Sequence, residues 1–77
     1  MQKTVITERA INAIADLPEV EPKVRRRLMQ RFGILSPATI KAWYSKRDDM
    51  LTTPDAVAII SEETGLKTSE ILGKVEL

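Results

Sequence analysis

The sequence contains no cysteine and no histidine. Without cysteine the chain can form no disulfide, thiolate metal site or thiol nucleophile. Without histidine it lacks the commonest zinc ligand and the usual general base near neutral pH. Adjacent carboxylates occur at Asp48-Asp49 and Glu62-Glu63, but neighbours on a helix point about 100° apart, so we interpret them as caps and solvated surface. The sequence therefore predicts no catalytic residues, no metal site and no cofactor.

Aromatic residues are scarce, and apolar runs are short. The only aromatics are Phe32, Trp43 and Tyr44, so the core has to be built mainly from Ile, Leu, Val and Ala, and dimerisation would help to stabilise it. No apolar run approaches the roughly 18 residues of a membrane span, and the N-terminal MQKTVITERA has no signal-peptide pattern. We expect one soluble, cytoplasmic domain over residues 1–77, too short for a core plus a separate catalytic cleft.

Acidic residues are absent from one long window, residues 23–47. The net charge is −2 over residues 1–22 and −5 over residues 48–77, against +1 for the whole chain. The window holds eight of the twelve basic residues: Lys23, Arg25, Arg26, Arg27, Arg31, Lys41, Lys46 and Arg47. A basic centre between acidic flanks favours a polyanion such as nucleic acid as partner, although a solvated basic face without a partner has the same pattern.

Apolar spacing and capping residues predict about five short helices, at residues 5–16, 22–32, 37–47, 54–64 and 69–73. Either Thr4 or Thr7 caps the first helix, and Pro18 prevents this helix from continuing. Its buried stripe is Ile6, Ala10, Ile11, Ile14 and Leu17. The tail 74–77 is either a loose end or a strand used in self-association. No other strand is predicted, so the fold class is all-α.

Each of the two central helices is predicted to have an apolar side that faces inward and a polar or basic side that faces outward. Pro22 is expected as the first residue of the second helix, and Gly33 ends it in the left-handed conformation. Its inward side is Val24, Leu28, Met29 and Phe32. Ser36 caps the third helix and Pro37 opens it. Ile40, Trp43 and Tyr44 form the inward stripe of this helix, and Trp43 and Tyr44 are interpreted as core rather than base-stacking groups.

The outward face of the third helix is Ala38, Lys41, Ala42 and Ser45. Its side chains are small and polar or basic, and such a helix can approach a groove closely. Exposed alanine is also simply a good helix former, so the composition alone does not decide between the two interpretations.

The closing half of the chain begins at Thr53-Pro54-Asp55, a strong helix start. Its buried residues are predicted to be Ala56, Val57, Ile59 and Ile60, with Glu62 and Glu63 facing outward. Gly65 ends the fourth helix, and Thr68 caps the last one.

The span from about Arg26 to Leu72 resembles the Cro/repressor-like (XRE-type) helix-turn-helix family. The features that carry the resemblance are Leu28, Gly33, Ile40 and Trp43, followed by Thr53–Leu72, which is similar to the closing half of that family nearly position for position. Two departures are Met29, where the family usually has a small alanine, and an interval from Gly33 to Ile40 that is one residue longer than usual. The resemblance implies a lambda-repressor-like bundle with a central helix-turn-helix.

It also implies major-groove binding by the helix at 37–47. Carried over by alignment on Ile40, the base-facing positions are Ser36, Pro37, Ala38, Lys41, Ala42 and Ser45. The expected phosphate contacts are Arg25, Arg26, Arg27, Gln30, Arg31, Lys46 and Arg47. Arg25 has an alternative, in which it packs on the core or pairs with Glu19 or Glu21. Because no Arg, Asn or Gln stands on the base-facing side, we expect affinity dominated by backbone charge and modest sequence preference.

The leading functional prediction is therefore a phage or bacterial transcriptional regulator, in the host cytoplasm or nucleoid, that binds double-stranded DNA as a homodimer. The alternative is a protein-interaction module, antitoxin-like or an adaptor, that keeps the fold but binds a protein partner and has weak or nonspecific DNA binding.

Overall fold

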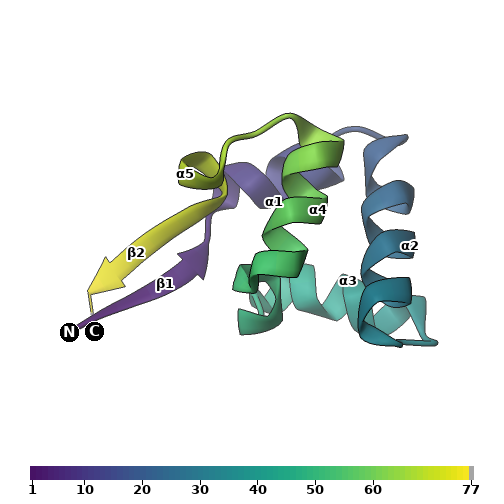
Figure 1. Cartoon of the computed structure of the whole chain (residues 1–77), viewed down its shortest axis with the longest axis horizontal. Helices are drawn as coiled ribbons and strands as arrows, with labels where there is room; N and C mark the ends of the chain where they lie inside the picture. The colour runs from purple at the N-terminus through teal and green to yellow at the C-terminus, as the bar shows by residue number, and fades with distance from the viewer. Residues whose placement is uncertain (77) are drawn as a thin grey trace.

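The computed structural model describes residues 1–76 and is mostly helical, with one small sheet (Figure 1). In chain order the elements are β1 (Gln2–Ile6), α1 (Glu8–Ala15), α2 (Val20–Phe32), α3 (Pro37–Lys46), the 3-10 turn η1 (Asp49–Thr52), α4 (Pro54–Thr64), α5 (Thr68–Ile71) and β2 (Leu72–Glu76). The prediction of a mainly helical chain is confirmed. The stricter prediction of an all-α fold is wrong, because both ends of the chain are strands.

The first predicted helix, 5–16, starts too early. Residues 2–6 pair with β2 in an antiparallel sheet, from Gln2 opposite Glu76 to Ile6 opposite Leu72. Thr7 then caps α1, and its Oγ1 accepts a hydrogen bond from the Ala10 N–H at 3.2 Å. Ile6 is buried as predicted, but from a strand. The predicted burial of Leu17 is wrong: α1 ends at Ala15, and Leu17 lies in the connector with 46% of its surface exposed.

The last predicted helix, 69–73, is also corrected. The structure places Lys67 rather than Thr68 at the cap position, α5 ends at Ile71, and the chain continues as β2 from Leu72. Residues 74–76 of the tail are thus part of a strand rather than a loose end, and its use in self-association stays a prediction. Its partner in the structure is β1 of the same chain; Leu77 lies outside the described residues.

The central helices largely follow their local signals. α2 begins at Val20, two residues before the predicted start, with Pro22 in its first turn, and Gly33 ends it with φ 67°. α3 begins at Pro37 as predicted and ends at Lys46, because Arg47 takes the left-handed conformation at φ 49°. α4 spans the predicted 54–64, from the Thr53 cap to Gly65 at φ 77°.

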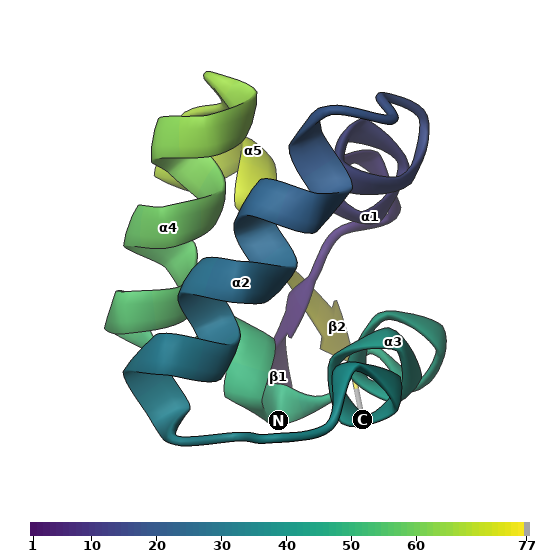
Figure 2. The ribbon, with the colours of Figure 1, turned by 90° about the vertical axis from the view of Figure 1, so that its right-hand side faces the viewer.

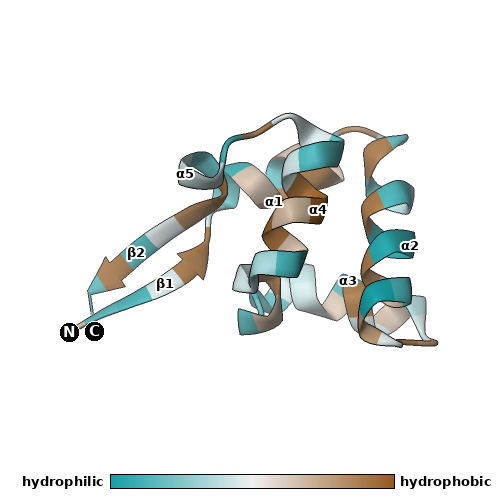
Figure 3. Ribbon diagram, in the orientation of Figure 1, coloured by the Kyte–Doolittle hydropathy of each residue, from teal (hydrophilic) through white to brown (hydrophobic). Residues whose placement is uncertain are grey.

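The core lies where the helices meet, on the brown stretches of the ribbon in Figure 3. α2 and α4 lie beside each other, and α3 crosses the C-terminal end of α2 (Figures 1 and 2). Aliphatic side chains fill the interior, and no polar side chain is buried among the described residues. The fully or nearly buried side chains are Ile6, Ala10, Ile14, Val20, Val24, Leu28, Ile40, Leu51, Ala56, Val57, Ile59, Ile60 and Ile71.

Candidate nucleic-acid interface

α3 is anchored through its inward stripe. Ile40 is completely buried, and Trp43 and Tyr44 are half-buried against the core. The Trp43 ring meets the Phe32 ring of α2 edge-on, with centroids 5.8 Å apart. The packing of Ile40, Trp43 and Tyr44 fixes which side of α3 faces outward, as the apolar spacing predicted.

The predicted base-facing residues lie on α3 or directly before it. Ser36, Pro37, Ala38, Lys41 and Ser45 are exposed, whereas Ala42 is half-buried. Ser36 stands at the cap position, but its hydroxyl makes no capping hydrogen bond. The hydroxyl of Ser45 donates to the Lys41 carbonyl at 3.3 Å, which leaves its oxygen able to accept from another donor.

Two of the predicted phosphate contacts, Arg26 and Lys46, are exposed and form no ion pair within residues 1–76, and a third, the neutral Gln30, is also exposed. Lys41 on the base-facing side also has no ion-pair partner in this part of the chain. These side chains are the freest to meet an external anion.

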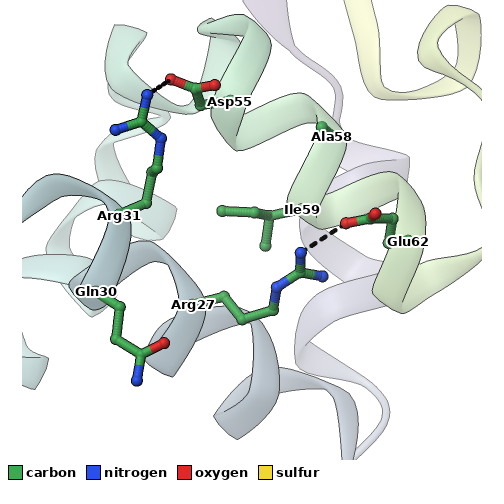
Figure 4. Close-up of a pocket in the computed structure, with 7 residues that line it drawn as sticks. All are labelled: Arg27, Gln30, Arg31, Asp55, Ala58, Ile59 and Glu62. Atoms are coloured by element: carbon green, nitrogen blue, oxygen red, sulfur yellow. Dashed lines mark hydrogen bonds and ion pairs between the residues drawn. The ribbon is translucent and has the colours of Figure 1, made fainter.

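Two other predicted phosphate contacts, Arg27 and Arg31, are held by carboxylates of α4. The Arg27 guanidinium lies 2.7 Å from Glu62 and 3.3 Å from Glu63, and Arg31 lies 2.6 Å from Asp55. Figure 4 shows these arginines reaching from α2 to α4 on either side of Ile59. The hydrogen bond from Arg27 to Glu62 raises the pKa of Arg27, which shows that the carboxylate favours the charged guanidinium.

The remaining two arginines are also paired. Arg25 donates to Glu21 at 2.9 Å, which agrees with the alternative that the sequence left open. Arg47 lies 3.9 Å from Glu8, a looser contact between exposed side chains. Four of the seven predicted phosphate contacts therefore have an acidic neighbour inside the molecule.

Sequence reasoning missed the partnership between α2 and α4. Glu62 and Glu63 were expected to face solvent, yet Glu63 is half-buried and both contact Arg27. The partners are separated by 35 and 36 residues, so local spacing held no signal for them. Only the packing of the two helices side by side brings these charges together.

Tyr44 connects α3 to the first turn of α2. Its hydroxyl donates to the Glu21 carboxylate at 3.5 Å, at the limit of a hydrogen bond. Burial raises the pKa of Tyr44, and the negative charge of Glu21 raises it further. Both effects extend the protonated state of the phenol to a higher pH than the usual tyrosine pKa of about 10.

Two other features, a metal-ligand cluster and a membrane-spanning helix, are absent from residues 1–76. No group of three or more carboxylates is close enough together there to hold a metal ion. The same residues include no helix with the length and apolar character that crossing a membrane requires.

Neither family models nor curated proteins nor solved structures include a match to this chain. The functional interpretation therefore depends on the residues and contacts described above.

Proposed function

We propose that this protein binds double-stranded DNA as a small transcriptional regulator, with α3 in the major groove. The observation that carries the proposal is the exposed side of α3. It combines small side chains with Lys41 and Lys46, contains no carboxylate, and is held outward by the buried Ile40. A helix with this shape and charge can enter a groove about 12 Å wide without a steric or electrostatic barrier.

The expected mode of DNA binding follows from the side chains that form no ion pair within residues 1–76. Lys46 and Arg26 can contact phosphates, Lys41 can donate to a guanine acceptor, and small residues such as Ala38 can contact a thymine methyl. No bidentate base contact is available on this side. Affinity then comes mainly from release of counterions, and sequence preference comes from DNA shape and a few weak contacts.

The unpaired edge of β2 is consistent with a homodimer. Within residues 1–76, β2 pairs only with β1, so its other edge carries unpaired backbone groups. Antiparallel pairing of two β2 strands centred on Val75 places Lys74 opposite Glu76 of the second copy, at both ends of the contact. Val75, 44% exposed, meets its own copy at the centre. Such a dimer has the twofold symmetry of a palindromic site.

A protein-interaction module is the second candidate, and one observation favours it. Arg25, Arg27, Arg31 and Arg47 are already paired with carboxylates, which lowers the positive potential available to DNA. This candidate predicts weak binding to any duplex and high affinity for a protein.

The decisive experiment is selection from a random duplex library at two salt concentrations, followed by sequencing. An enriched palindromic motif with steep salt dependence is the expected result. Lys41→Ala should weaken binding and relax the preference at one base position, and Lys46→Ala should lower the salt slope by about 0.9 for one lost phosphate contact. Lys67→Ala, an exposed lysine just before α5, serves as the charge-matched control and should bind like wild type.

Absence of binding even at low salt contradicts the DNA proposal and favours the protein-interaction module. Steep salt dependence without a motif identifies a nonspecific, architectural binder instead.

A further inference from the structure

An apolar hollow of about 580 Å³ opens along the outer side of α2 and the segment that leads to α3. Met29, Ile34 and Leu35 supply its apolar wall. Figure 2 looks onto this end of the molecule and shows the connecting segment passing from the end of α2 to α3. The hollow is shallow and open, so a side chain from another molecule can enter it directly.

Leu35 is the unusual residue of this wall, because 95% of its surface is exposed. Met29 and Ile34 are half-buried and pack against the core, so the fold itself explains them. The Leu35 side chain, in contrast, is not packed against the core. DNA binding does not explain it well either, since phosphates and most base edges are recognised by charged and polar groups. A leucine exposed beside other apolar side chains is typical of a protein-binding surface.

The charge around the hollow is positive. None of the side chains that line it is acidic, and two are arginines. Arg25 is neutralised by Glu21 at 2.9 Å. Arg26 is exposed and forms no ion pair within residues 1–76, and Lys23, one helical turn earlier on α2, is equally exposed and unpaired there. Residues three apart on a helix are neighbours, so Lys23 adds positive charge next to Arg26, which lines the hollow.

We propose that this hollow binds an acidic segment of a protein partner. The segment inserts a large apolar side chain between Leu35 and Met29 and places a carboxylate on Arg26. An apolar anchor surrounded by complementary charge is the usual composition of a small interface. This docking surface differs from the proposed DNA contact on α3 but shares Arg26 with it, so a bound partner competes with DNA for one phosphate contact.

The test uses the full chain and a short synthetic peptide in which Leu and Phe are interspersed with Asp and Glu. Chemical-shift mapping should show changes at Met29, Ile34 and Leu35, and a peptide with Lys in place of the acids should leave them unchanged. Leu35→Ser should weaken peptide binding about tenfold or more. Because Leu35 is almost fully exposed, this variant should keep the fold and its DNA affinity.

Leu17→Ser is the matched control, since Leu17 is an exposed leucine outside the hollow, and it should bind the peptide like wild type. Arg26→Glu tests the role of charge independently and should weaken peptide binding more than Leu17→Ser does. Shifts confined to α3, or unchanged affinity in Leu35→Ser, overturn the proposal. If Leu35→Ser instead abolishes self-association measured by sedimentation, the occupant is a second copy of the chain and the assignment to a partner protein is wrong.

Discussion

Single residues at the junction of α2 and α3 decide how α3 is held. Glu21 is the shared group: its carboxylate receives the Arg25 guanidinium at 2.9 Å and the Tyr44 hydroxyl at 3.5 Å. Tyr44 is half-buried and cannot ionise without placing a second negative charge beside Glu21. The position of α3 is therefore coupled to the protonation of one phenol.

Stability should consequently fall in alkaline solution. The folded state raises the pKa of Tyr44, so the protonated phenol contributes stability that is fully present below the unfolded pKa of about 10 and is lost as the pH rises beyond it. Denaturant unfolding between about pH 8 and pH 11 should show a steeper decline in wild type than in Tyr44→Phe. Because Tyr44 is the only tyrosine, its titration can be followed directly by ultraviolet absorbance. Parallel declines in the two proteins would contradict this coupling.

At the scale of elements, the turn from α2 to α3 depends on one backbone conformation. Gly33 has φ 67°, and a Cβ at this position would meet no atom within 4 Å. The cost of a side chain there comes from the left-handed conformation alone and not from a clash. The direction of α3 relative to α2 thus depends on the backbone conformation of Gly33 and not on side-chain packing at this position.

Replacing this glycine should lower stability by a defined amount. Gly33→Ala should reduce the free energy of unfolding by about 1–2 kcal/mol, measured by denaturant titration. Gly33→Asn should cost clearly less, because asparagine tolerates the left-handed region. Equal losses in the two variants would show that the conformation is not the cause.

The ion pairs between α2 and α4 lead to a second prediction at this scale. Asp55→Asn removes the carboxylate 2.6 Å from Arg31, so Arg31 becomes available to phosphate and DNA affinity should rise about two- to fivefold. Asp16→Asn removes an equal charge from an exposed residue that forms no ion pair within residues 1–76 and should have a smaller effect. The comparison is made by titration of one duplex at fixed salt. If the two variants bind alike, Arg31 is not restrained by α4.

The sequence predicted those elements whose signals are local. α3 and α4 begin at Ser36-Pro37 and Thr53-Pro54, and α2 and α4 end at glycines with positive φ, so caps and turns were readable within a few residues. β1 was not readable, because QKTVI becomes a strand only through pairing with residues about 70 positions away. The outward face of α3 was predictable from spacing, whereas the ion pairs of Arg27 and Arg31 required the packing of α2 against α4.

At the scale of the whole molecule, the sheet extends away from the helices and carries both ends of the chain (Figure 1). β1 also contacts η1, where Lys3 lies 3.3 Å from Asp49, while β2 leaves one edge free. The proposed dimer would continue this sheet across the twofold axis.

Charge exchange within β2 tests this arrangement. Lys74→Glu would place two acids opposite each other in the dimer and should shift the protein to monomer, and Lys74→Glu combined with Glu76→Lys should restore association. The strand partners of these residues in β1 are Thr4 and Gln2, both neutral, so Lys74→Glu should leave the pairing inside each chain intact, whereas Glu76→Lys also removes the exposed ion pair of Glu76 with the N-terminal ammonium at 3.1 Å. Sedimentation velocity measures the result. An unchanged dimer in Lys74→Glu would place the interface elsewhere.

The pairing of β1 with β2 also sets the order of events during synthesis. β1 is made before every helix of residues 1–76, yet its hydrogen-bonding partner β2 is made after all of them. Until then Val5 and Ile6 have no sheet to join, and the buried position of Ile6 stays unfilled. The nascent helices can form early, but the sheet closes only once residue 76 is free. The sheet is thus the last part of residues 1–76 that can form during synthesis.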